Sequence, residues 1–488
     1  MSEEILINVT PNETRVAQLE NGVLQEVSLE RAGRRGWVGN IYKGRVSRVL
    51  TGMQAAFVEI GLTRTAFLHA SDMQRRPDDD ADAECAPEAD ITTLLAEGDE
   101  VVVQVIKDPL GSKGARLTTT IALASRCLVL LPDSGQIGIS ARIEAEQERQ
   151  RLRTILETLR DGEQPGYIVR TNAENMDADS LAADVAFLQR LWNGIQRRVA
   201  QTAAGEMIYE DLPLVLRTLR DMLGREVEKV RIDSRYWYEK SVDFVTQLMP
   251  DRAPLIHHYP GERPIFDLYG VDDEIDQALR RTSPLKSGGY LVIDQTESMT
   301  TIDVNTGGYV GHRKLEDTIY KTNLEAAQAI ARQLRLRNLG GIIIIDFIDM
   351  ADAQHQSQVM NLLERSLSKD HAKTQIHPLS PLGLVEMTRK RTTESLAHIL
   401  CEPCPSCDGR GAIKTAESMS HEVFREVMRA VKQFAAEKLM VIAAVDVVDY
   451  ILEEEQTAVM ELEQSISKPI QFKAEDQYSQ EQFDVVVL

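Results

Sequence analysis

The chain has 488 residues, of which 55 are Lys or Arg and 76 are Asp or Glu, so its formal net charge at pH 7 is −21. This length predicts roughly three or four domains, and 43% hydrophobic with 27% charged residues is typical of a globular protein. The acidic balance excludes a uniformly basic nucleic-acid coat but leaves room for a local basic groove.

The N-terminal segment MSEEILINVT lacks the positive and apolar stretches of a targeting sequence. The longest aliphatic run, Ile342 to Ile345, is far shorter than the ~20 residues that a membrane span needs. Three of the five cysteines cluster at Cys401, Cys404 and Cys407, which favours a metal site over a disulfide framework. We therefore expect a cytoplasmic protein with no membrane span.

The first part of the chain is predicted to consist mainly of strands. Asn21-Gly22 separates two alternating segments and predicts a hairpin. Short alternating segments with Gly turns between residues 36 and 125 predict a small β-barrel. The acidic segment 75–90 interrupts them and looks like a variable insertion, to which we assign no function.

Helical and strand patterns then alternate. We expect helices at 143–159, at 179–200, across 211–250 and from Leu315 to the stop at Gly340. We also expect a segment at 264–281 that begins as a strand and ends as a helix, a hairpin at 287–308, and a small α/β domain after 415. The run from Ile342 to Ile345 predicts a strand that is buried on both faces.

Two aromatic residues of the predicted barrel, Phe57 and Phe67, stand ten residues apart on successive strands, with cations around them. Stacking platforms beside cations are what a single-stranded RNA groove requires. The alternative is that both rings belong to the barrel core. The motif GNIYKGRVSRVLTGMQAAFVEIG resembles the opening of an S1-type OB domain, an RNA-binding module, and favours the groove.

Two aspartates, Asp303 and Asp346, end neighbouring predicted strands, in TTIDVN and IIIIDFID. Carboxylates at adjoining strand ends can converge on Mg²⁺, which favours one or two carboxylates with water and substrate phosphate. The alternative is that each Asp is a loop or cap residue, but an Asp after four isoleucines is costly if buried unpaired. Asn305 would face the same side as Asp303 and could hydrogen-bond a phosphate.

The segment CEPCPSCDGRG contains Cys404-x-x-Cys407, which resembles a zinc knuckle. A redox pair is the alternative, although the Pro and Gly residues around it suit zinc better. Tetrahedral zinc needs two more ligands. Either His398 and Cys401 complete the site within the chain, or a second chain donates its own pair.

In GYIVRT, Arg170 and Thr171 could form a monophosphate clamp, because Arg forks onto phosphate and Thr adds a donor. The alternative is an exposed Arg that pairs with a local carboxylate.

Taken together, these motifs resemble the ribonuclease E/G family over nearly the whole chain. The similarity runs through ILINVTPNETRVA, GNIYKGRVSRVL, LKSGGYLVIDQTESMTTIDVNTG, ARQLRLRNLGGIIIIDFIDM, LGLVEMTRKR, CPSCDGRG and QFDVVVL. No long Pro/Arg-rich extension follows residue 488, so we expect no degradosome scaffold tail.

The resemblance implies an α+β multidomain chain. Its parts in order are the first part of an RNase H-like subdomain (1–35), an inserted S1 RNA-binding OB-fold (36–125), a 5′-sensor region (126–214), the second RNase H-like part (215–278), a DNase I-like catalytic subdomain (279–400), a zinc link (401–414) and a small α/β dimerisation domain (415–488).

The resemblance also implies site residues. Asp303 and Asp346 would bind Mg²⁺ and Asn305 would contact phosphate, whereas Cys404 and Cys407 would share structural Zn²⁺ with a second subunit. The 5′-monophosphate pocket would consist of Arg170, Thr171, Val129 and Ser125, where the family has Gly at the last position. RNA-binding residues would be Phe57, Phe67, Lys107, Lys113, Arg142 and Lys373, where a relative has Arg at the last position.

The function that the resemblance implies is a Mg-dependent, single-strand-specific endoribonuclease of the bacterial cytoplasm, stimulated by a 5′-monophosphate end. It would cut A/U-rich RNA to 5′-phosphate and 3′-hydroxyl products, mature the 5′ end of 16S ribosomal RNA and turn over mRNAs. It would be a homodimer, with a tetramer left open. The rival hypotheses are a non-catalytic RNA-binding scaffold and a DNA nuclease.

Basic residues gather in two stretches despite the negative total. We expect them to line an RNA groove at the barrel entry (Arg31, Arg34, Arg35, Lys43, Arg45, Arg48) and in the nuclease region (Arg332, Arg335, Arg337, Arg389, Lys390, Arg391).

Overall fold

The computed structural model describes residues 2–73, 90–109, 114–160, 162, 165–223, 227–308, 315–391, 393–434 and 437–488. The chain divides into two compact units, Met1–Leu396 and Ala397–Leu488. Nearly all of the acidic segment 75–90, Lys113 and the side chain of Arg34 lie outside the described residues. Among the helices that are described, none is long and apolar enough to cross a bilayer.

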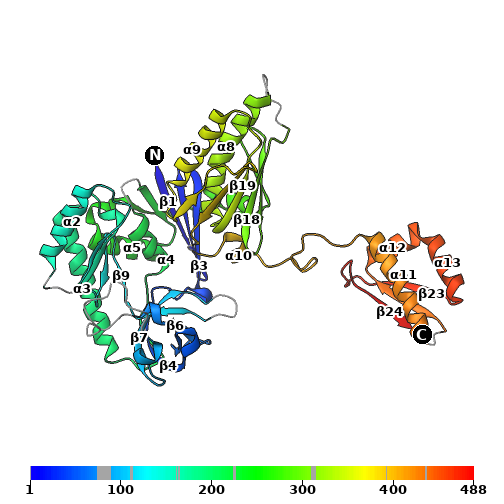
Figure 1. The fold of residues 1–488 in the computed structure, drawn as a ribbon, viewed down its shortest axis with the longest axis horizontal. Helices are drawn as coiled ribbons and strands as arrows, with labels where there is room; N and C mark the ends of the chain where they lie inside the picture. Colours follow the sequence, from blue (N-terminus) through cyan, green and yellow to red (C-terminus); the bar gives the residue numbers. More distant parts are fainter. Residues whose placement is uncertain are drawn as a thin grey trace. The chain divides into compact units, whose positions relative to one another are not determined.

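The first unit contains a five-stranded sheet built from two distant parts of the chain (Figure 1). Its order is β15-β14-β1-β2-β3, with β1 (Glu3–Val9), β2 (Glu13–Glu20) and β3 (Val23–Arg31) antiparallel and β14 (Val227–Ile232) and β15 (Ile256–His258) added in parallel. Asn21 and Gly22 both adopt positive φ, which confirms the predicted hairpin turn. The helices that accompany this sheet are α4 (Leu214–Met222), α5 (Arg235–Leu248), α6 (Ile265–Leu268) and α7 (Val271–Leu279).

The predicted barrel is present. Its sheet has the order β13-β4-β5-β6-β8-β7, and an additional pairing of β4 with β7 closes it. The elements are β4 (Ile41–Leu50), β5 (Ala55–Glu59), β6 (Ala66–His69), α1 (Ile91–Leu94), β7 (Glu100–Lys107), β8 (Arg116–Thr118) and β13 (Glu206–Tyr209). Alternate residues such as Ala56, Val58, Ala66 and Leu68 fill its core, so their neighbours point outward.

A four-stranded sheet with two helices follows the barrel. Its order is β11-β12-β10-β9, from β9 (Leu123–Ala124), β10 (Leu128–Leu131), β11 (Ile137–Ile139) and β12 (Gly166–Val169), and its helices are α2 (Glu146–Leu159) and α3 (Ala178–Val199). The α3 helix begins where the Asp177 side chain accepts the Ser180 backbone N–H. Leu181, Val185 and Leu188 then recur at helical spacing and are buried against the sheet.

A six-stranded sheet completes the first unit. Its order is β16-β17-β18-β19-β21-β20, from β16 (Thr282–Pro284), β17 (Tyr290–Gln295), β18 (Met299–Asn305), β19 (Gly341–Asp346), β20 (Thr374–Ile376) and β21 (Leu384–Arg389). The helices α8 (Leu315–Leu336) and α9 (Ala353–Leu367) pack on one face, where Ile302, Ile343 and Ile345 are buried. Alternate strand residues therefore lie on the opposite, open face.

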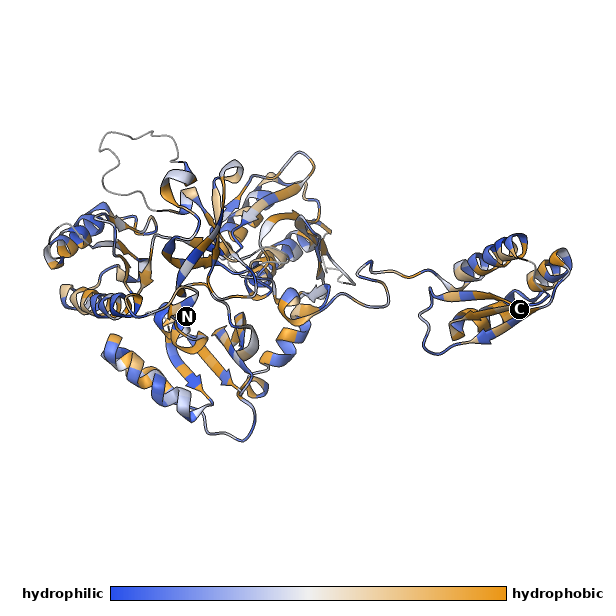
Figure 2. Ribbon diagram, turned by 90° about the horizontal axis from the view of Figure 1, so that it is seen from below, coloured by the Kyte–Doolittle hydropathy of each residue, from blue (hydrophilic) through white to orange (hydrophobic). Residues whose placement is uncertain are grey.

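The second unit is a small α/β fold. Its three-stranded sheet has the order β23-β22-β24, and its elements are α10 (Leu396–Leu400), which begins in the first unit, α11 (Ala416–Gln433), β22 (Leu439–Ala443), α12 (Val445–Glu454), α13 (Gln456–Ile466), β23 (Ile470–Ala474) and β24 (Phe483–Val487). Its strands are mainly hydrophobic, whereas its helices alternate hydrophobic and hydrophilic residues (Figure 2).

Two predictions of secondary structure are wrong. Residues 211–250 are not one helix, because β14 separates α4 from α5; its Val230 and Ile232 are buried at strand spacing. The segment after Pro264 begins as the short helix α6 rather than a strand. Ile265 and Phe266 are both fully buried, which the alternating sides of a half-buried strand would not allow.

Candidate active site and RNA-binding surfaces

The two aspartates that the sequence singled out lie side by side. Asp303 on β18 and Asp346 on β19 are register partners in the one parallel pair of this sheet. Both are on its open face, and Asn305 donates a hydrogen bond from Nδ2 to Asp303 Oδ2 at 2.7 Å. Partial burial raises the pKa of Asp346, and the neighbouring Asp303 and Asp349 raise it further. Crowded carboxylates of this kind favour a bound cation.

The burial argument for Asp346 is wrong. The strand β19 is not buried on both faces: Ile343 and Ile345 are fully buried, but Ile342 is 48% exposed and Asp346 is exposed as well. Helices cover only one face of this sheet, so every second residue of the Ile run meets solvent. The in-register pairing, rather than burial, makes the two aspartates a candidate site.

Sequence reasoning missed a residue that supports this site. Asn323 of α8 is fully buried, and its amide both donates to Ile348 O at 2.8 Å and accepts from Ile348 N at 3.1 Å. Ile348 comes two residues after Asp346, so the amide fixes the backbone that leaves β19. The only signal in the sequence was an Asn within an amphipathic helix, where a polar residue would be expected to face water.

The chemistry of these groups fits a hard cation. Two carboxylates suit Mg²⁺, which takes few protein ligands and keeps water and substrate oxygens in its shell. Within the described residues, no group of three or more His, Cys, Asp and Glu side chains gathers in a metal-binding arrangement. Water and phosphate oxygens would therefore have to complete the shell around Asp303 and Asp346.

The aromatic residues of the barrel point outward. A row of register partners crosses neighbouring strands in the order Arg48, Phe57, Phe67, Arg116 and Lys107. The two Phe rings meet edge to face, with centroids 6.3 Å apart. Both rings are partly exposed, so they are not core residues, which contradicts the alternative interpretation of these positions. A strip of two rings between cations suits stacked bases and their phosphates.

The strip is extended by a residue that the sequence analysis overlooked. The ring of His69 lies 6.3 Å from Phe67, tilted by 36°. It follows Phe67 at strand spacing and could have been found from that spacing alone. Arg116 is held in place by Asp72, at 2.7 Å.

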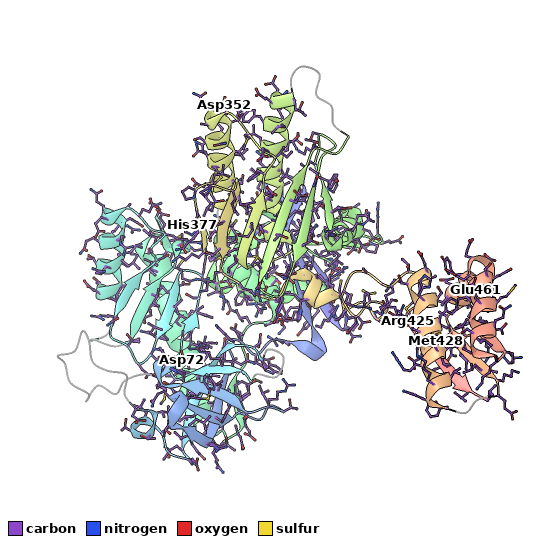
Figure 3. All side chains as sticks on the ribbon, turned by 45° about the vertical axis from the view of Figure 1, so that its right-hand side comes forward. Asp72, Asp352, His377, Arg425, Met428 and Glu461 are labelled. Carbon is purple, nitrogen blue, oxygen red and sulfur yellow. The ribbon has the colours of Figure 1, made fainter. Side chains whose placement is uncertain are left out.

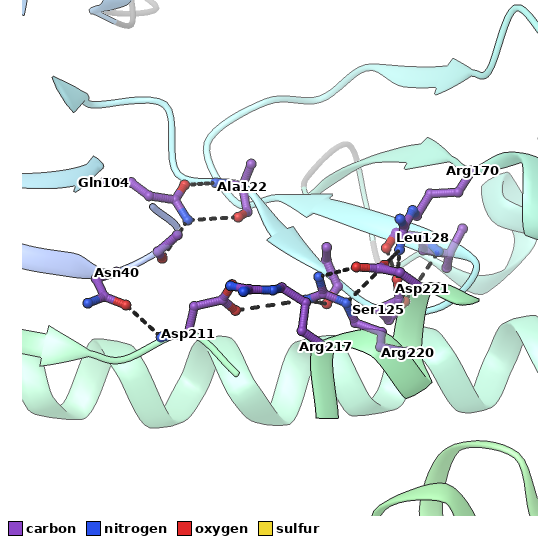
Figure 4. A network of polar contacts seen from close by, with 12 residues as sticks. Asn40, Gln104, Ala122, Ser125, Leu128, Arg170, Asp211, Arg217, Arg220 and Asp221 are labelled. Atoms are coloured by element: carbon purple, nitrogen blue, oxygen red, sulfur yellow. Dashed lines mark hydrogen bonds and ion pairs between the residues drawn. The ribbon is translucent and has the colours of Figure 1, made fainter. Parts of the chain in front are cut away.

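The predicted phosphate pocket lies where β12 ends, beside β10. Arg170 Nη1 contacts Asp221 Oδ1 at 2.7 Å and donates to Ser125 O at 2.6 Å (Figure 4). Thr171 is exposed, and its hydroxyl lies 3.2 Å from that of Ser140. Val129 pairs through its backbone with Ile168. The simpler interpretation, that Arg170 pairs with a local carboxylate, describes part of its contacts.

Ser125 does not present its side chain to the pocket. It is fully buried, and its hydroxyl donates to Asp184 Oδ2 at 2.6 Å. The same oxygen accepts the Cys127 backbone N–H at 2.8 Å. Burial raises the pKa of Asp184, although the hydrogen bonds from Ser125 and Cys127 oppose the rise. The Ser125 hydroxyl therefore fixes the backbone of the pocket through Asp184, and the Ser125 backbone carbonyl accepts a hydrogen bond from Arg170.

The remaining predicted RNA contacts are exposed. Arg142 donates from Nη2 to His371 O at 2.8 Å and so joins the sheet of β9–β12 to the segment before β20. Lys373 lies two residues along that segment, with its side chain exposed. Lys107 is exposed at the end of β7. Arg142 and Lys373 are thus brought to one region, whereas Lys107 belongs to the barrel strip.

Comparisons with known proteins bear on this geometry. A model described as the ribonuclease E/G family matches residues 122–392. The chain is 51% identical over 490 residues to Ribonuclease G of Salmonella typhimurium (strain SL1344) and 50% to that of Escherichia coli (strain K12), with all of each chain covered. It is 36% identical over 466 residues to Ribonuclease E of Escherichia coli (strain K12), covering 94% of this chain and 44% of that one.

This chain belongs to the ribonuclease E/G family. Two further domain models match other parts of this family member. A model of the S1 RNA binding domain covers residues 37–117, and a model described as RNase E/G, Thioredoxin-like domain covers 403–487. The outward strip of Phe57 and Phe67 thus lies on an S1 barrel, and the second unit is thioredoxin-like. The names RNase H-like, DNase I-like and 5′-sensor stay predictions for the other parts.

The cysteine pair of this family member lies just before α11. Cys404 is exposed and Cys407 is buried, and both are free thiols. Backbone N–H groups of Ser406 and Cys407 lower the pKa of Cys404, and the Cys407 side chain lowers it further. No third His, Cys, Asp or Glu gathers with them in the described part of the chain, and both ways of completing a zinc site, with His398 and Cys401 or with a second chain, stay predictions. Thiolates with S-donor spacing suit zinc, but two more ligands are needed.

Three of the basic residues expected to line the groove, Arg335, Arg337 and Arg389, are buried, so that expectation is wrong for them. Arg335 is buried and contacts Glu20 and Glu26 at 2.7 and 2.8 Å, which ties α8 to the five-stranded sheet. Arg389 is buried beside Asp370 at 2.6 Å. Arg337 donates a hydrogen bond to the Arg280 carbonyl. Further ion pairs join Arg332 to Glu274, Arg31 to Glu13, Arg35 to Glu210, and both Lys43 and Arg45 to Glu100.

Proposed function

We propose that this family member is an endoribonuclease that cuts single-stranded, A/U-rich RNA by metal-assisted hydrolysis. The observation that carries the proposal is the in-register pair Asp303 and Asp346 on an open sheet face, with Asn305 beside it. Relatives at 50% identity over the full chain are named Ribonuclease G, and the S1 barrel supplies a surface for RNA. Together they support a hydrolase that acts on RNA.

In this proposal Asp303 and Asp346 hold Mg²⁺. When bound, the ion supplies a Lewis acid for the scissile phosphate and acidifies a water molecule. Asn305 orients the Asp303 carboxylate and has a second amide proton that can reach a phosphate oxygen. Because water rather than the RNA 2′-hydroxyl attacks, the products carry a 5′-phosphate and a 3′-hydroxyl.

The substrate would be gripped at two further places. Bases stack on Phe57 and Phe67 of the barrel strip, with Lys107 near the backbone. A 5′-monophosphate end binds Arg170 and Thr171, with a backbone contribution from Val129, and raises the rate of cleavage.

The proposal extends to assembly and cellular role. Cys404 and Cys407 would share Zn²⁺ with the same pair of a second subunit, which makes a homodimer the smallest complete form. The proposed role is maturation of the 5′ end of 16S ribosomal RNA and turnover of some mRNAs in the cytoplasm, and the relatives named Ribonuclease G support the ribonuclease activity on which it rests.

Cleavage of an A/U-rich single-stranded RNA in Mg²⁺ tests the proposed chemistry. Asp303→Asn should bind the RNA but lower kcat by at least about a hundredfold, since a metal ligand is lost. The matched control is Asp352→Asn at the start of α9, labelled in Figure 3, because Asn caps a helix as well as Asp does. The control should cut like wild type.

Three outcomes would overturn parts of the proposal. Products with a 2′,3′-cyclic phosphate contradict attack by water. If the wild type binds RNA without cutting it, the rival scaffold hypothesis holds. Equal cleavage of a DNA strand of the same sequence would favour a DNA nuclease.

A further inference from the structure

The hydrogen bond of Arg170 to Ser125 and its ion-pair distance to Asp221 involve the same nitrogen. The Nη1 atom contacts both Ser125 O, at 2.6 Å, and Asp221 Oδ1, at 2.7 Å. The guanidinium has five N–H donors, of which Nη1 carries two. Among the described residues, no hydrogen bond reaches its Nε or Nη2. The Nε–Nη2 edge, which forks onto a phosphate, is thus left open.

Asp221 is itself fixed by a second arginine. Arg220 Nε contacts Asp221 Oδ1 at 3.1 Å, and its Nη2 contacts Asp221 Oδ2 at 2.8 Å, a bidentate arrangement (Figure 4). Arg220 is 9% exposed, and Asp211 lies 3.8 Å from its Nη1. Burial alone would raise the pKa of Asp221, but its contacts with Arg220 and Arg170 outweigh this and lower it. The carboxylate is therefore charged and held in one orientation.

This arrangement also places the pocket between two parts of the chain. Arg170 follows β12 in the four-stranded sheet, whereas Asp221 and Arg220 lie on α4, which packs against the five-stranded sheet. Arg170 Nη1 is therefore contacted both by Ser125 O, which follows β9 of the four-stranded sheet, and by Asp221 Oδ1 on α4. Without Asp221, only the carbonyl would restrain the guanidinium.

We infer that Asp221, clamped by Arg220, is a positioning residue that turns the Nε–Nη2 edge of Arg170 toward a terminal phosphate of the RNA. This inference rests on the proposed 5′-monophosphate pocket and deepens it. Through Asp221, α4 would then contribute to the preference for RNA with a 5′-monophosphate end. Asp221 does not touch the phosphate, because its charge would repel it.

The test compares two RNAs of one sequence, with a 5′-monophosphate or a 5′-hydroxyl, cut by the zinc-loaded protein. The ratio of kcat/KM for the two RNAs does not depend on the fraction of protein that is folded, because both RNAs are cut by the same sample. Asp221→Asn should lower this ratio at least about tenfold, the worth of a charge-assisted hydrogen bond. The loss should fall on KM for the monophosphorylated RNA. Asp221→Glu, which keeps a carboxylate, should recover part of the ratio.

The control is Asp179→Asn, an exposed aspartate on α3 outside this network, which should keep the wild-type ratio. Arg170→Ala measures the pocket itself. If Arg170→Ala lowers the ratio but Asp221→Asn does not, the positioning role is overturned and the pocket stands. If the wild-type ratio is already one, the proposed pocket fails, and the inference fails with it.

Discussion

Asn323 and Ile348 are joined by two hydrogen bonds between a buried side-chain amide and a single backbone unit. We predict that Asn323→Ala lowers kcat by about 10- to 100-fold, because a small displacement of a catalytic group costs that much. It should also raise the Mg²⁺ concentration that gives half-maximal cleavage, because Asp346 lies two residues before Ile348. A metal titration of the cleavage rate checks both.

The matched control for this prediction is Asn361→Ala on α9, an exposed Asn that makes a long hydrogen bond to Ser357 at 3.4 Å. It should leave both quantities unchanged. If Asn323→Ala unfolds at a lower temperature but keeps the wild-type Mg²⁺ dependence, Asn323 stabilises the fold and does not position the site.

The barrel strip leads to a prediction about affinity. Phe57→Ala and Phe67→Ala should each weaken binding of a single-stranded RNA by about 1–3 kcal/mol, the worth of one base stacked on a ring. Fluorescence anisotropy with a labelled RNA measures this. Tyr236→Ala removes an aromatic ring of 61% exposure outside the barrel and should change nothing. Wild-type affinity in both Phe variants would show that RNA does not use this strip.

The aspartate pair and the barrel strip could be predicted from sequence because local patterns determine them. Strand ends and the alternation of residues fix which side chains share a face, and this holds for Asp303, Asn305 and Phe57. Whether that face is covered by helices is a property of the whole fold. The burial argument for Asp346 therefore failed, although the aspartate itself was correctly chosen.

The role of the basic residues was harder to predict. The partners of Arg335 are Glu20 and Glu26, more than 300 positions earlier in the chain. A count of charges along the sequence has no means of pairing groups at that distance. Asn323 and Asp221 were missed for the same reason, since each acts on a backbone or side chain from another element.

The zinc proposal predicts a stoichiometry. Protein purified without chelator should contain about half a zinc per chain, because two pairs of cysteines complete one tetrahedral site. Cys404→Ser or Cys407→Ser should lose the metal and, in analytical ultracentrifugation, the dimer. Cys401→Ser is the control and should keep both, since the proposed shared site uses only Cys404 and Cys407 of each chain. One zinc per chain would contradict sharing.

The ion pair of Arg389 and Asp370 predicts a large effect on stability. Their side chains are 5% and 1% exposed, so Arg389→Ala leaves a buried carboxylate without its partner. We expect a loss of roughly 3–5 kcal/mol, seen as a lower midpoint of thermal unfolding. The control is Arg281→Ala, which breaks an ion pair whose Arg281 and Asp294 side chains are 70% and 42% exposed. It should lower the free energy of unfolding by only about 0–1 kcal/mol. Equal losses would contradict the role of burial.

Asp184 predicts a dependence of stability on pH. Burial raises its pKa above the ordinary value of 3.8, so the folded state holds the proton more tightly than the unfolded state. Its contribution to stability is therefore most favourable at low pH and declines as pH rises from 3.8 through the raised pKa. Asp184→Asn keeps an oxygen for the Cys127 N–H but cannot ionise.

The variant should therefore lose less stability than wild type between pH 4 and pH 7, measured as the midpoint of thermal unfolding. Asp179→Asn, on the same helix but exposed, should follow the wild-type curve. If Asp184→Asn and wild type change in parallel across this range, the folded state holds the Asp184 proton no more tightly than the unfolded state, and its pKa is not raised by folding.

The five-stranded sheet joins β1 to β14, whose first residues, Glu3 and Val227, lie far apart in the chain. During synthesis, the hairpins of β1–β3 must wait for this partner for about 10–40 s at ordinary rates of translation. The barrel and the four-stranded sheet lie wholly within that interval and can fold first. The edge of β1 stays unpaired on the ribosome meanwhile, which makes it the place where a slowed or truncated chain would aggregate.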